Sequence, residues 1–357
     1  QEREHGEAAA HILDRGLYDQ RRGKVPAATP GFLPSLEGPG PFNRLHLARW
    51  LVDDANPLTS RVAVNRFWQQ VFGEGLVRTS DDFGAQGEPP SHPELLDWLA
   101  VEFRAGGWDV KRLLRMMLSS ATYRQSPQAG RAKLGKDPRN RLLSRGPRFR
   151  MDAEMLRDFG LAASGMLSAK VGGPSVKPYQ PDGVWESVAM PGSNTRSYKR
   201  DEGDKLYRRS LYTFWKRAAP PASMQIFDAP TREHATVRRE RTNTPLQALV
   251  TMNDPQFVEA ARLLAQAALQ HAGPEFGARL DFLTARLLAR ELGQRERAVA
   301  EQSLAAFLRH YEGDCEDASQ LLDTGASPAD AQLPGPELAA WTMLASQLLN
   351  LDEALNK

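Results

Sequence analysis

The stretch Arg-Thr-Asn-Thr-Pro-Leu-Gln-Ala-Leu at residues 241–249, which runs on to Asn-Asp-Pro at residues 253–255, decides how the chain is organised. Thr244 before Pro245 is typical of a helix N-cap followed by proline at the first helical position, where the missing N–H is not needed. Asn253 or Asp254 before Pro255 repeats the pattern. The sequence therefore predicts one helix that begins at Pro245 and a second that begins at Pro255.

Two interpretations of this stretch remain open. The start of a helix presents unpaired N–H groups and the positive end of the helix dipole, which favour an anionic or oxygen-rich ligand. On that view Arg241, Asn243 and Gln247 bind substrate, and we expect Arg241 and Asn243 to face the same space as Trp215. The simpler interpretation is two capped helices that meet at a corner.

Charge is unevenly distributed along a chain of otherwise ordinary composition. The 357 residues, 41% of them hydrophobic and 25% charged, suffice for two domains or one large one. Residues 131–150 have eight Lys or Arg against one acid, residues 196–241 have twelve against six, and residues 291–357 have four against twelve. The basic middle predicts either an anionic partner or docking on the acidic C-terminal part.

Several kinds of site are disfavoured. No apolar run approaches the length of about 18 residues that a membrane span needs, so none is expected in this chain. Cys315 is the only cysteine, which excludes an internal disulfide, and there is no Cys-x-x-Cys-His motif for haem c. No paired histidines suggest zinc, so no metal site is expected. The net charge is only +2 and no nucleic-acid-binding module is present, so nucleic acid is not an expected partner.

Helix start and stop signals predict a mainly α fold, a multi-helix globular bundle with an irregular Pro/Gly-rich middle. Residues 1–42 are interpreted as the tail of a preceding domain, with the end of a helix up to about residue 18, followed by a linker. Residues 43–357 form the helical domain. Within it, residues 167–242 are predicted to be an irregular insertion with at most a few short strands, one of them near residues 210–214. Residues 243–357 are predicted to be helical, with an acidic loop at residues 312–335.

Two polar residues share the apolar face of the helix predicted at residues 57–72. At 100° per residue, Arg61 and Asn65 fall on the same arc as Val64 and Trp68. A buried polar group without a hydrogen bond costs about 1–3 kcal/mol. Arg61 and Asn65 therefore belong either to a structural polar network or to a substrate-binding site.

The loop at residues 76–92 carries Glu88 and His92, which are candidate catalytic residues because loops on a rigid scaffold often hold functional groups. Ser91 and Glu94 have the spacing of a capping box and are predicted to start the next helix. A histidine beside a helix cap is equally consistent with a structural role.

Asp152 and Glu154 lie near the start of a helix predicted at about residues 148–166. Two carboxylates that converge can perform general acid/base chemistry, so both are candidate catalytic residues. The alternative is a solvent-exposed ion-pair face, because Glu154, Arg157 and Asp158 have the i, i+3, i+4 spacing. The apolar face of this helix is predicted to consist of Met155, Phe159, Ala162 and Met166.

Aromatic and basic residues alternate at residues 211–217, Leu-Tyr-Thr-Phe-Trp-Lys-Arg. Trp215 and Arg217 are candidate substrate-binding residues, since aromatic rings can stack on sugar rings or bases. The simpler interpretation is a strand with one solvent-exposed face.

Four segments together resemble a known family: Asn-Pro-Leu-Thr-Ser-Arg-Val-Ala-Val-Asn-Arg-Phe-Trp (56–68), Gly-Glu-Pro-Pro-Ser-His-Pro-Glu-Leu-Leu-Asp-Trp-Leu (87–99), Ser-Ala-Thr-Tyr-Arg-Gln-Ser (120–126) and the stretch at 241–249. From about residue 43 to the closing Leu-Asn-Leu-Asp-Glu (349–353), the chain resembles the planctomycete-specific C-terminal domain of unknown function. That domain is found in proteins that also carry planctomycete-type cytochrome c domains.

The resemblance implies export to the periplasm or cell surface, a haem c domain elsewhere in the parent protein, and a setting of polysaccharide degradation. No haem is expected in this chain itself, because the attachment motif is missing. The expected function is a carbohydrate-directed domain that acts on a glycan or anionic polysaccharide with a cytochrome c domain as partner. The alternative is a non-catalytic module that binds or docks the glycan or the cytochrome.

Overall fold

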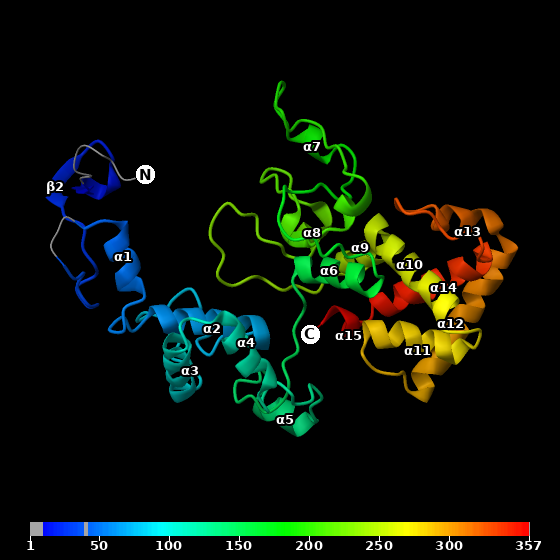
Figure 1. Cartoon of the computed structure of the whole chain (residues 1–357), viewed down its shortest axis with the longest axis horizontal. Coiled ribbons are helices and arrows are strands. Elements are labelled where there is room, and N and C mark those ends of the chain that lie inside the picture. The colour runs from blue at the N-terminus through cyan, green and yellow to red at the C-terminus, as the bar shows by residue number, and fades with distance from the viewer. Residues whose placement is uncertain (1–9, 39–41, 357) are drawn as a thin grey trace. The chain divides into compact units, whose positions relative to one another are not determined.

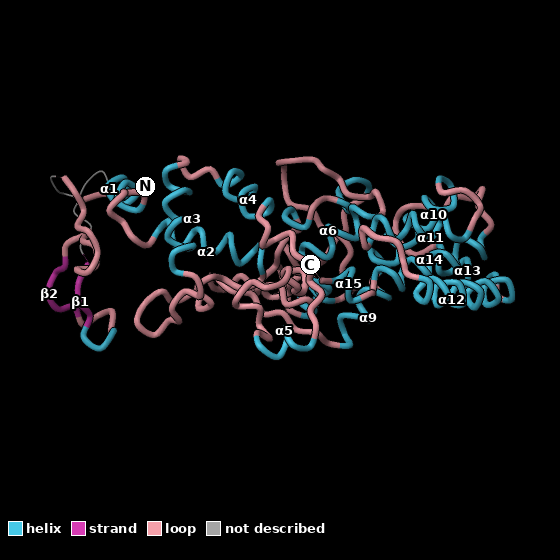
Figure 2. The backbone as a smooth tube through the Cα atoms, turned by 90° about the horizontal axis from the view of Figure 1, so that it is seen from below, coloured by secondary structure: helices cyan, strands magenta, loops and turns pink. Residues whose placement is uncertain are grey.

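The computed structural model describes residues 10–38 and 42–356. Contacts divide the chain into two compact units, Gln1–Pro147 and Arg148–Lys357, hereafter unit 1 and unit 2. The described residues form fifteen α-helices and one two-stranded sheet, which confirms the mainly α fold (Figure 1). Figure 2 shows how much of the chain between the helices is loop.

Unit 1 begins with a β-hairpin. Strands β1 (Ala10–Leu13) and β2 (Arg21–Val25) pair antiparallel, and Arg15 and Gly16 turn the chain back with φ angles of 48° and 79°. The predicted end of a helix was therefore wrong over residues 10–18, because this positive-φ turn reverses the chain where a helix would have continued. The rest of that prediction, residues 1–9, lies outside the described residues.

Helices α2 (Thr59–Phe72), α3 (Pro93–Ala105) and α4 (Val110–Ser119) enclose the core of unit 1. Helix α1 (Arg44–Leu51) precedes them and α5 (Arg131–Lys136) follows. Asn65 is fully buried in this core: its Nδ2 donates to Val77 O at 2.9 Å, and its Oδ1 accepts from Val77 N at 2.8 Å. The Asn65 amide thus satisfies the backbone N–H and C=O of Val77, which lies in the loop after α2. These contacts agree with a structural polar network, one of the two roles expected for Asn65.

Unit 2 contains the remaining helices: α6 (Ala153–Ala163), α7 (Val184–Ser187), α8 (Ala222–Ile226), α9 (Pro245–Asn253), α10 (Pro255–His271), α11 (Phe276–Leu287), α12 (Gln294–Gly313), α13 (Cys315–Leu322), α14 (Gly335–Leu349) and α15 (Asp352–Leu355). The predicted starts at Pro245 and Pro255 are confirmed, and Asp254 caps α10 by accepting from Gln256 N at 3.0 Å. Helix α13 occupies part of the predicted acidic loop, because Asp314 caps it by accepting from Asp317 N.

Helices α10 and α14 form the centre of unit 2. Small residues on both, such as Ala261, Ala265 and Ala339, are fully buried and let the helices pack closely. The irregular segment between α6 and α9 lies against this core. It contains two short 3₁₀ helices, Gly203–Tyr207 and Ser210–Tyr212, and only isolated bridges such as Val176 with Thr213. Residues 210–214, predicted as a strand, therefore form only one isolated bridge, at Thr213.

Buried charged side chains hold the irregular segment. Arg157 on α6 is 4% exposed, and its guanidinium donates to the carbonyls of Leu206 and Arg208 at 2.7 and 2.6 Å and to Gln256 Oε1 at 2.8 Å. Burial lowers the pKa of Arg157 to about 10, so it remains charged at neutral pH. The predicted exposed ion-pair face was wrong for Arg157, because carbonyls without a strand partner need a donor.

The set of residues predicted to form the apolar face of this helix was also partly wrong. Helix α6 buries Leu156, Gly160 and Leu161 beside Arg157, while Met155 and Ala162 are exposed. The face of α6 that carries Arg157, and not its most apolar face, therefore packs against the irregular segment.

Glu259 on α10 is the acidic counterpart of Arg157. It is fully buried, and its Oε1 accepts from Tyr207 Oη at 2.8 Å and from the backbone N–H groups of Ala326 and Ser327 at 3.0 and 2.7 Å. Its Oε2 accepts from Tyr179 Oη at 2.8 Å. One carboxylate thus connects α10, the irregular segment and the loop after α13.

We predict that Arg157→Met destabilises the protein by about 3 kcal/mol or more, because the substitution leaves buried carbonyls without donors. Chemical denaturation of the two proteins measures the difference. Arg309→Met, which removes an exposed arginine from α12, is the control and should change the unfolding free energy by less than about 0.5 kcal/mol. Equal effects of the two substitutions would show that Arg157 does not hold the irregular segment.

Candidate functional site

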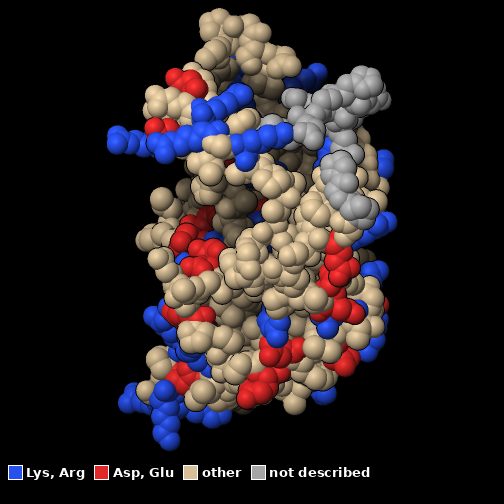
Figure 3. All heavy atoms as spheres, turned by 90° about the vertical axis from the view of Figure 1, so that its left-hand side faces the viewer, with Lys and Arg blue, Asp and Glu red and all other residues tan. Residues whose placement is uncertain are grey.

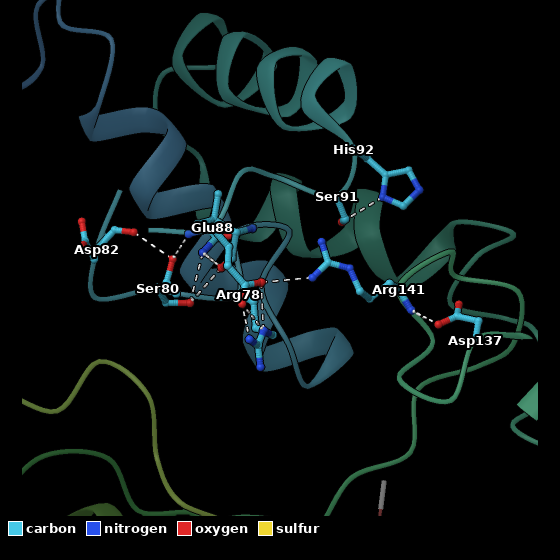
Figure 4. A network of polar contacts seen from close by, with 11 residues as sticks. Arg78, Ser80, Asp82, Glu88, Ser91, His92, Asp137 and Arg141 are labelled. Carbon is cyan, nitrogen blue, oxygen red and sulfur yellow. Dashed lines mark hydrogen bonds and ion pairs between the residues drawn. The ribbon is translucent and has the colours of Figure 1, made fainter. Parts of the chain in front are cut away.

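Glu88 is the centre of a polar network in unit 1 (Figure 4). The Nε of Arg78 lies 3.0 Å from both carboxylate oxygens of Glu88, and Arg141 Nη1 donates to Oε2 at 3.1 Å. The hydrogen bonds from Arg78, and then those from Arg141, lower the pKa of Glu88 to about 2. Glu88 is therefore ionised at neutral pH, which suits an ion pair and opposes a role as proton donor.

His92 has a different set of contacts. It occupies the N-cap position of α3, and its Nδ1 lies 3.0 Å from Ser91 Oγ. Figure 4 shows the ring beyond Ser91 and directed away from Glu88. The predicted Ser91–Glu94 capping box was wrong, because α3 starts at Pro93, one residue later than that box requires. Glu88 and His92 thus serve separate contacts in one loop.

The chain from Gly130 to Pro147, hereafter the basic segment, turns its one acidic residue inward. Asp137 is 8% exposed and accepts from the backbone N–H groups of Arg141 and Leu142 at 2.9 and 2.7 Å. Burial raises the pKa of Asp137, but these two N–H groups and the nearby arginines outweigh it and bring the pKa below its usual value. The Asp137 carboxylate therefore fixes the turn and does not neutralise the surface.

The cations of the basic segment divide into two groups. Lys133, Arg141 and Arg145 bind Ser144 O, Glu88 and the carbonyls of residues 137 and 138. Arg131, Lys136 and Arg139 are exposed and form no ion pair with any residue that the structure describes. Basic and acidic side chains are interspersed on the face in Figure 3.

In unit 2, Asp152 and Glu154 lie at the start of α6 and are paired with arginines. Arg239 Nη1 donates to Glu154 Oε2 at 2.5 Å and lies 3.8 Å from Asp152 Oδ2, and Arg241 Nε lies 3.6 Å from Asp152 Oδ1. The structure brings the two candidate carboxylates together, but around a guanidinium. Sequence reasoning missed Arg239, and the run Arg-Arg-Glu-Arg at residues 238–241 was the available signal.

The other candidate residues near α9, Asn243 and Gln247, form hydrogen bonds with nearby side chains and a backbone carbonyl. Asn243 Oδ1 accepts from Arg150 Nη2 at 2.8 Å, and buried Gln247 donates to Ile226 O and Thr242 Oγ1, each at 3.1 Å. In unit 1, Arg61 pairs with Asp97 at 2.7 Å. Each of these side chains has a partner within its own unit.

Trp215 and Arg217 lie elsewhere on unit 2. Trp215 is half-buried, its Nε1 donates to Thr231 O at 3.3 Å, and the guanidinium of Arg232 lies 4.2 Å from its ring centre. Arg217 is exposed. The guanidinium of Arg241 lies over Phe149, 4.4 Å from the ring centre.

Two further observations concern the described residues as a whole. No group of three or more His, Cys, Asp or Glu side chains within residues 10–38 and 42–356 is placed to hold a metal ion. In the same part of the chain, no helix combines the length and apolar character needed to cross a membrane.

We predict that Glu88→Gln lowers the melting temperature at pH 7, because it removes the ion pairs with Arg78 and Arg141. Since the pKa of Glu88 is lowered from 4.5 to about 2 on folding, these pairs stabilise the protein above about pH 4.5 and are lost as the pH falls toward 2. The gap between the melting temperatures of wild type and variant should therefore close over that range. Glu37→Gln, at an exposed position, is the control, and a gap that persists at pH 2 would contradict the prediction.

Comparison with known proteins places the chain in a family but assigns no activity. One family model matches residues 43–304, more than half of the chain, and its description is PSD1, protein of unknown function (DUF1553). No curated protein and no solved structure matches the chain. The matched range runs from the N-cap of α1 into α12 and so includes the basic segment and the arginine pairs of Asp152 and Glu154. The chain therefore belongs to the PSD1 family of proteins of unknown function (DUF1553).

Proposed function

We propose that the chain is a non-catalytic module that binds an anionic polysaccharide. The observation that carries this proposal is the basic segment, in which Arg131, Lys136 and Arg139 are exposed while Asp137 is buried against backbone N–H groups. Such a surface attracts sulfate or carboxylate groups, because these three cations form no ion pair with a described residue. Guanidinium groups also form bidentate hydrogen bonds to these anions.

The candidate carboxylates support binding rather than cleavage. Glycoside hydrolysis needs one carboxyl group that is protonated and a second that is a free nucleophile or base. Glu88, Asp152 and Glu154 each contact one or two arginines, and the lowered pKa of Glu88 opposes a proton-donor role. These acids are engaged by arginines, which supports a module that does not cleave its ligand.

The proposed setting is an exported protein whose haem c domain performs any redox chemistry. The resemblance to domains that accompany planctomycete-type cytochrome c supports this setting. Residues of this chain do not fit haem attachment, because its single cysteine, Cys315, is exposed at the start of α13 and is not followed by histidine. The module would hold the polysaccharide while another domain acts on it.

We predict that the triple variant Arg131→Ala, Lys136→Ala, Arg139→Ala weakens binding to a sulfated polysaccharide by about ten- to hundredfold at low salt, at about 0.5–1 kcal/mol for each exposed cation. Isothermal titration calorimetry on the full chain measures this. Binding by the wild type should weaken as salt is added, because screening acts on exposed charges.

The matched control is the triple variant Arg66→Ala, Lys111→Ala, Arg115→Ala, which removes the same charge from exposed positions on α2 and α4. It should retain most of the affinity. Equal losses in the two triple variants would reduce the interaction to net charge and contradict the assignment. Release of shorter chains from the polysaccharide by the wild type would contradict the non-catalytic role.

A further inference from the structure

The loop formed by residues 228–242, hereafter the arginine loop, joins α8 to α9 in unit 2 (Figure 1). Its ends are tied together, since the Asp228 carboxylate accepts from Thr242 N at 2.7 Å and from Thr242 Oγ1 at 2.8 Å. Arg239 fixes the returning part of the loop to Glu154. Between these ties, residues 231–236 are all exposed. Surface loops with closed ends are often functional.

Trp215 lies beneath the arginine loop. Its ring packs against an apolar cluster that includes Leu156, Met224 and Phe227. Thr231 O holds the indole N–H, and the guanidinium of the next residue, Arg232, covers the ring. The loop thus fixes the edge of the indole with one residue and shields its face with the following one.

The backbone conformation of Arg232, and not an ion pair, positions its guanidinium over the Trp215 ring. Arg232 has a φ of 64°, a conformation that non-glycine residues adopt infrequently, and this places its side chain over the ring. It is exposed, and within the described ranges it forms no ion pair. A cation–π contact at an exposed site is weak, so a ligand can displace the guanidinium at little cost.

We propose that Trp215 is a stacking platform for a neutral sugar ring, and that the ring displaces the guanidinium of Arg232 when it binds. The apolar C–H face of a pyranose matches the flat, electron-rich face of an indole. This site rests on the proposed function only for its ligand class, a glycan, and lies in a different unit from the basic segment.

Charge around the ring is nearly balanced. The arginine loop contains three acids, Asp228, Glu233 and Glu240, against four arginines, Arg232, Arg238, Arg239 and Arg241. The nearby carboxylates of Asp152 and Glu154 are paired with Arg239 and Arg241. The surroundings of Trp215 therefore have no large excess of positive charge to select a phosphate or a sulfate, and the flat apolar face of the indole is what a ligand would contact.

The test compares two substitutions with opposite expected effects on binding of neutral β-1,4-linked hexasaccharides of glucose and xylose, measured by calorimetry on the full chain. Arg232→Ala uncovers the ring and should tighten binding of one or both by about two- to fivefold, the value of an exposed cation–π contact. Trp215→Ala should weaken it by about fivefold or more, the value of one stacked ring.

Three further variants serve as controls. Trp98→Ala removes a half-exposed tryptophan from α3 in unit 1, and Arg238→Ala removes an exposed arginine from the arginine loop itself. Neither should change the affinity. If Trp215→Ala unfolds, Trp215→Phe preserves an aromatic ring in the packing and should retain part of the binding, while the increase in Arg232→Ala still tests the cover.

Salt separates this site from the basic segment. Binding of a neutral hexasaccharide should persist in 0.5 M NaCl, where exposed charge interactions are screened at a Debye length of about 4 Å. Weaker binding in Arg232→Ala, unchanged binding in Trp215→Ala, tighter binding of a single-stranded oligonucleotide, or no binding of either hexasaccharide by the wild type would each overturn the proposal. If the triple variant in the basic segment binds a sulfated polysaccharide as tightly as the wild type, the proposed function is contradicted but the Trp215 proposal is not.

Discussion

A buried backbone without regular partners is the constraint on which unit 2 depends. The irregular segment between α6 and α9 is bonded to α10 through Tyr179, Tyr207 and Glu259, yet it has no strands to satisfy its carbonyl and N–H groups. Arg157 and Arg208 donate to its carbonyls, and the Glu259 carboxylate accepts from tyrosine hydroxyls of the segment and from the loop after α13. Long charged side chains therefore substitute for a sheet.

The same constraint explains why charged residues of this chain are poor guides to a site. In most globular proteins a buried arginine or glutamate is a candidate functional residue, because charged side chains are rarely buried. Here Arg157 and Glu259 have a complete structural explanation in their hydrogen bonds, and so does the pairing of Glu154 with Arg239. The residues left for binding are at the surface: cations that form no ion pair within the described residues, and the Trp215 ring, whose face is covered only by a cation–π contact with Arg232.

Local signals were sufficient to predict much of the helical fold. Thr244–Pro245 and Asp254–Pro255 fix the starts of α9 and α10 because capping depends on residues within one turn. The orientation of α6 was not predictable, since it depends on carbonyls about fifty residues away. The pairing of Glu154 with Arg239, 85 residues apart, is equally invisible to spacing. The basic segment was visible as charge, but the inward turn of Asp137 became clear only from its backbone contacts.

Shape and charge are set by different residues in the basic segment. Asp137, Asn140 and Arg145 hold the turn through bonds to backbone atoms, and none of these bonds involves the side chains of Arg131, Lys136 or Arg139. The outward residues can therefore change during evolution while the scaffold beneath them stays constant. Under the proposed function, substitutions at these few surface positions would change which polymer the chain binds, with little cost to folding.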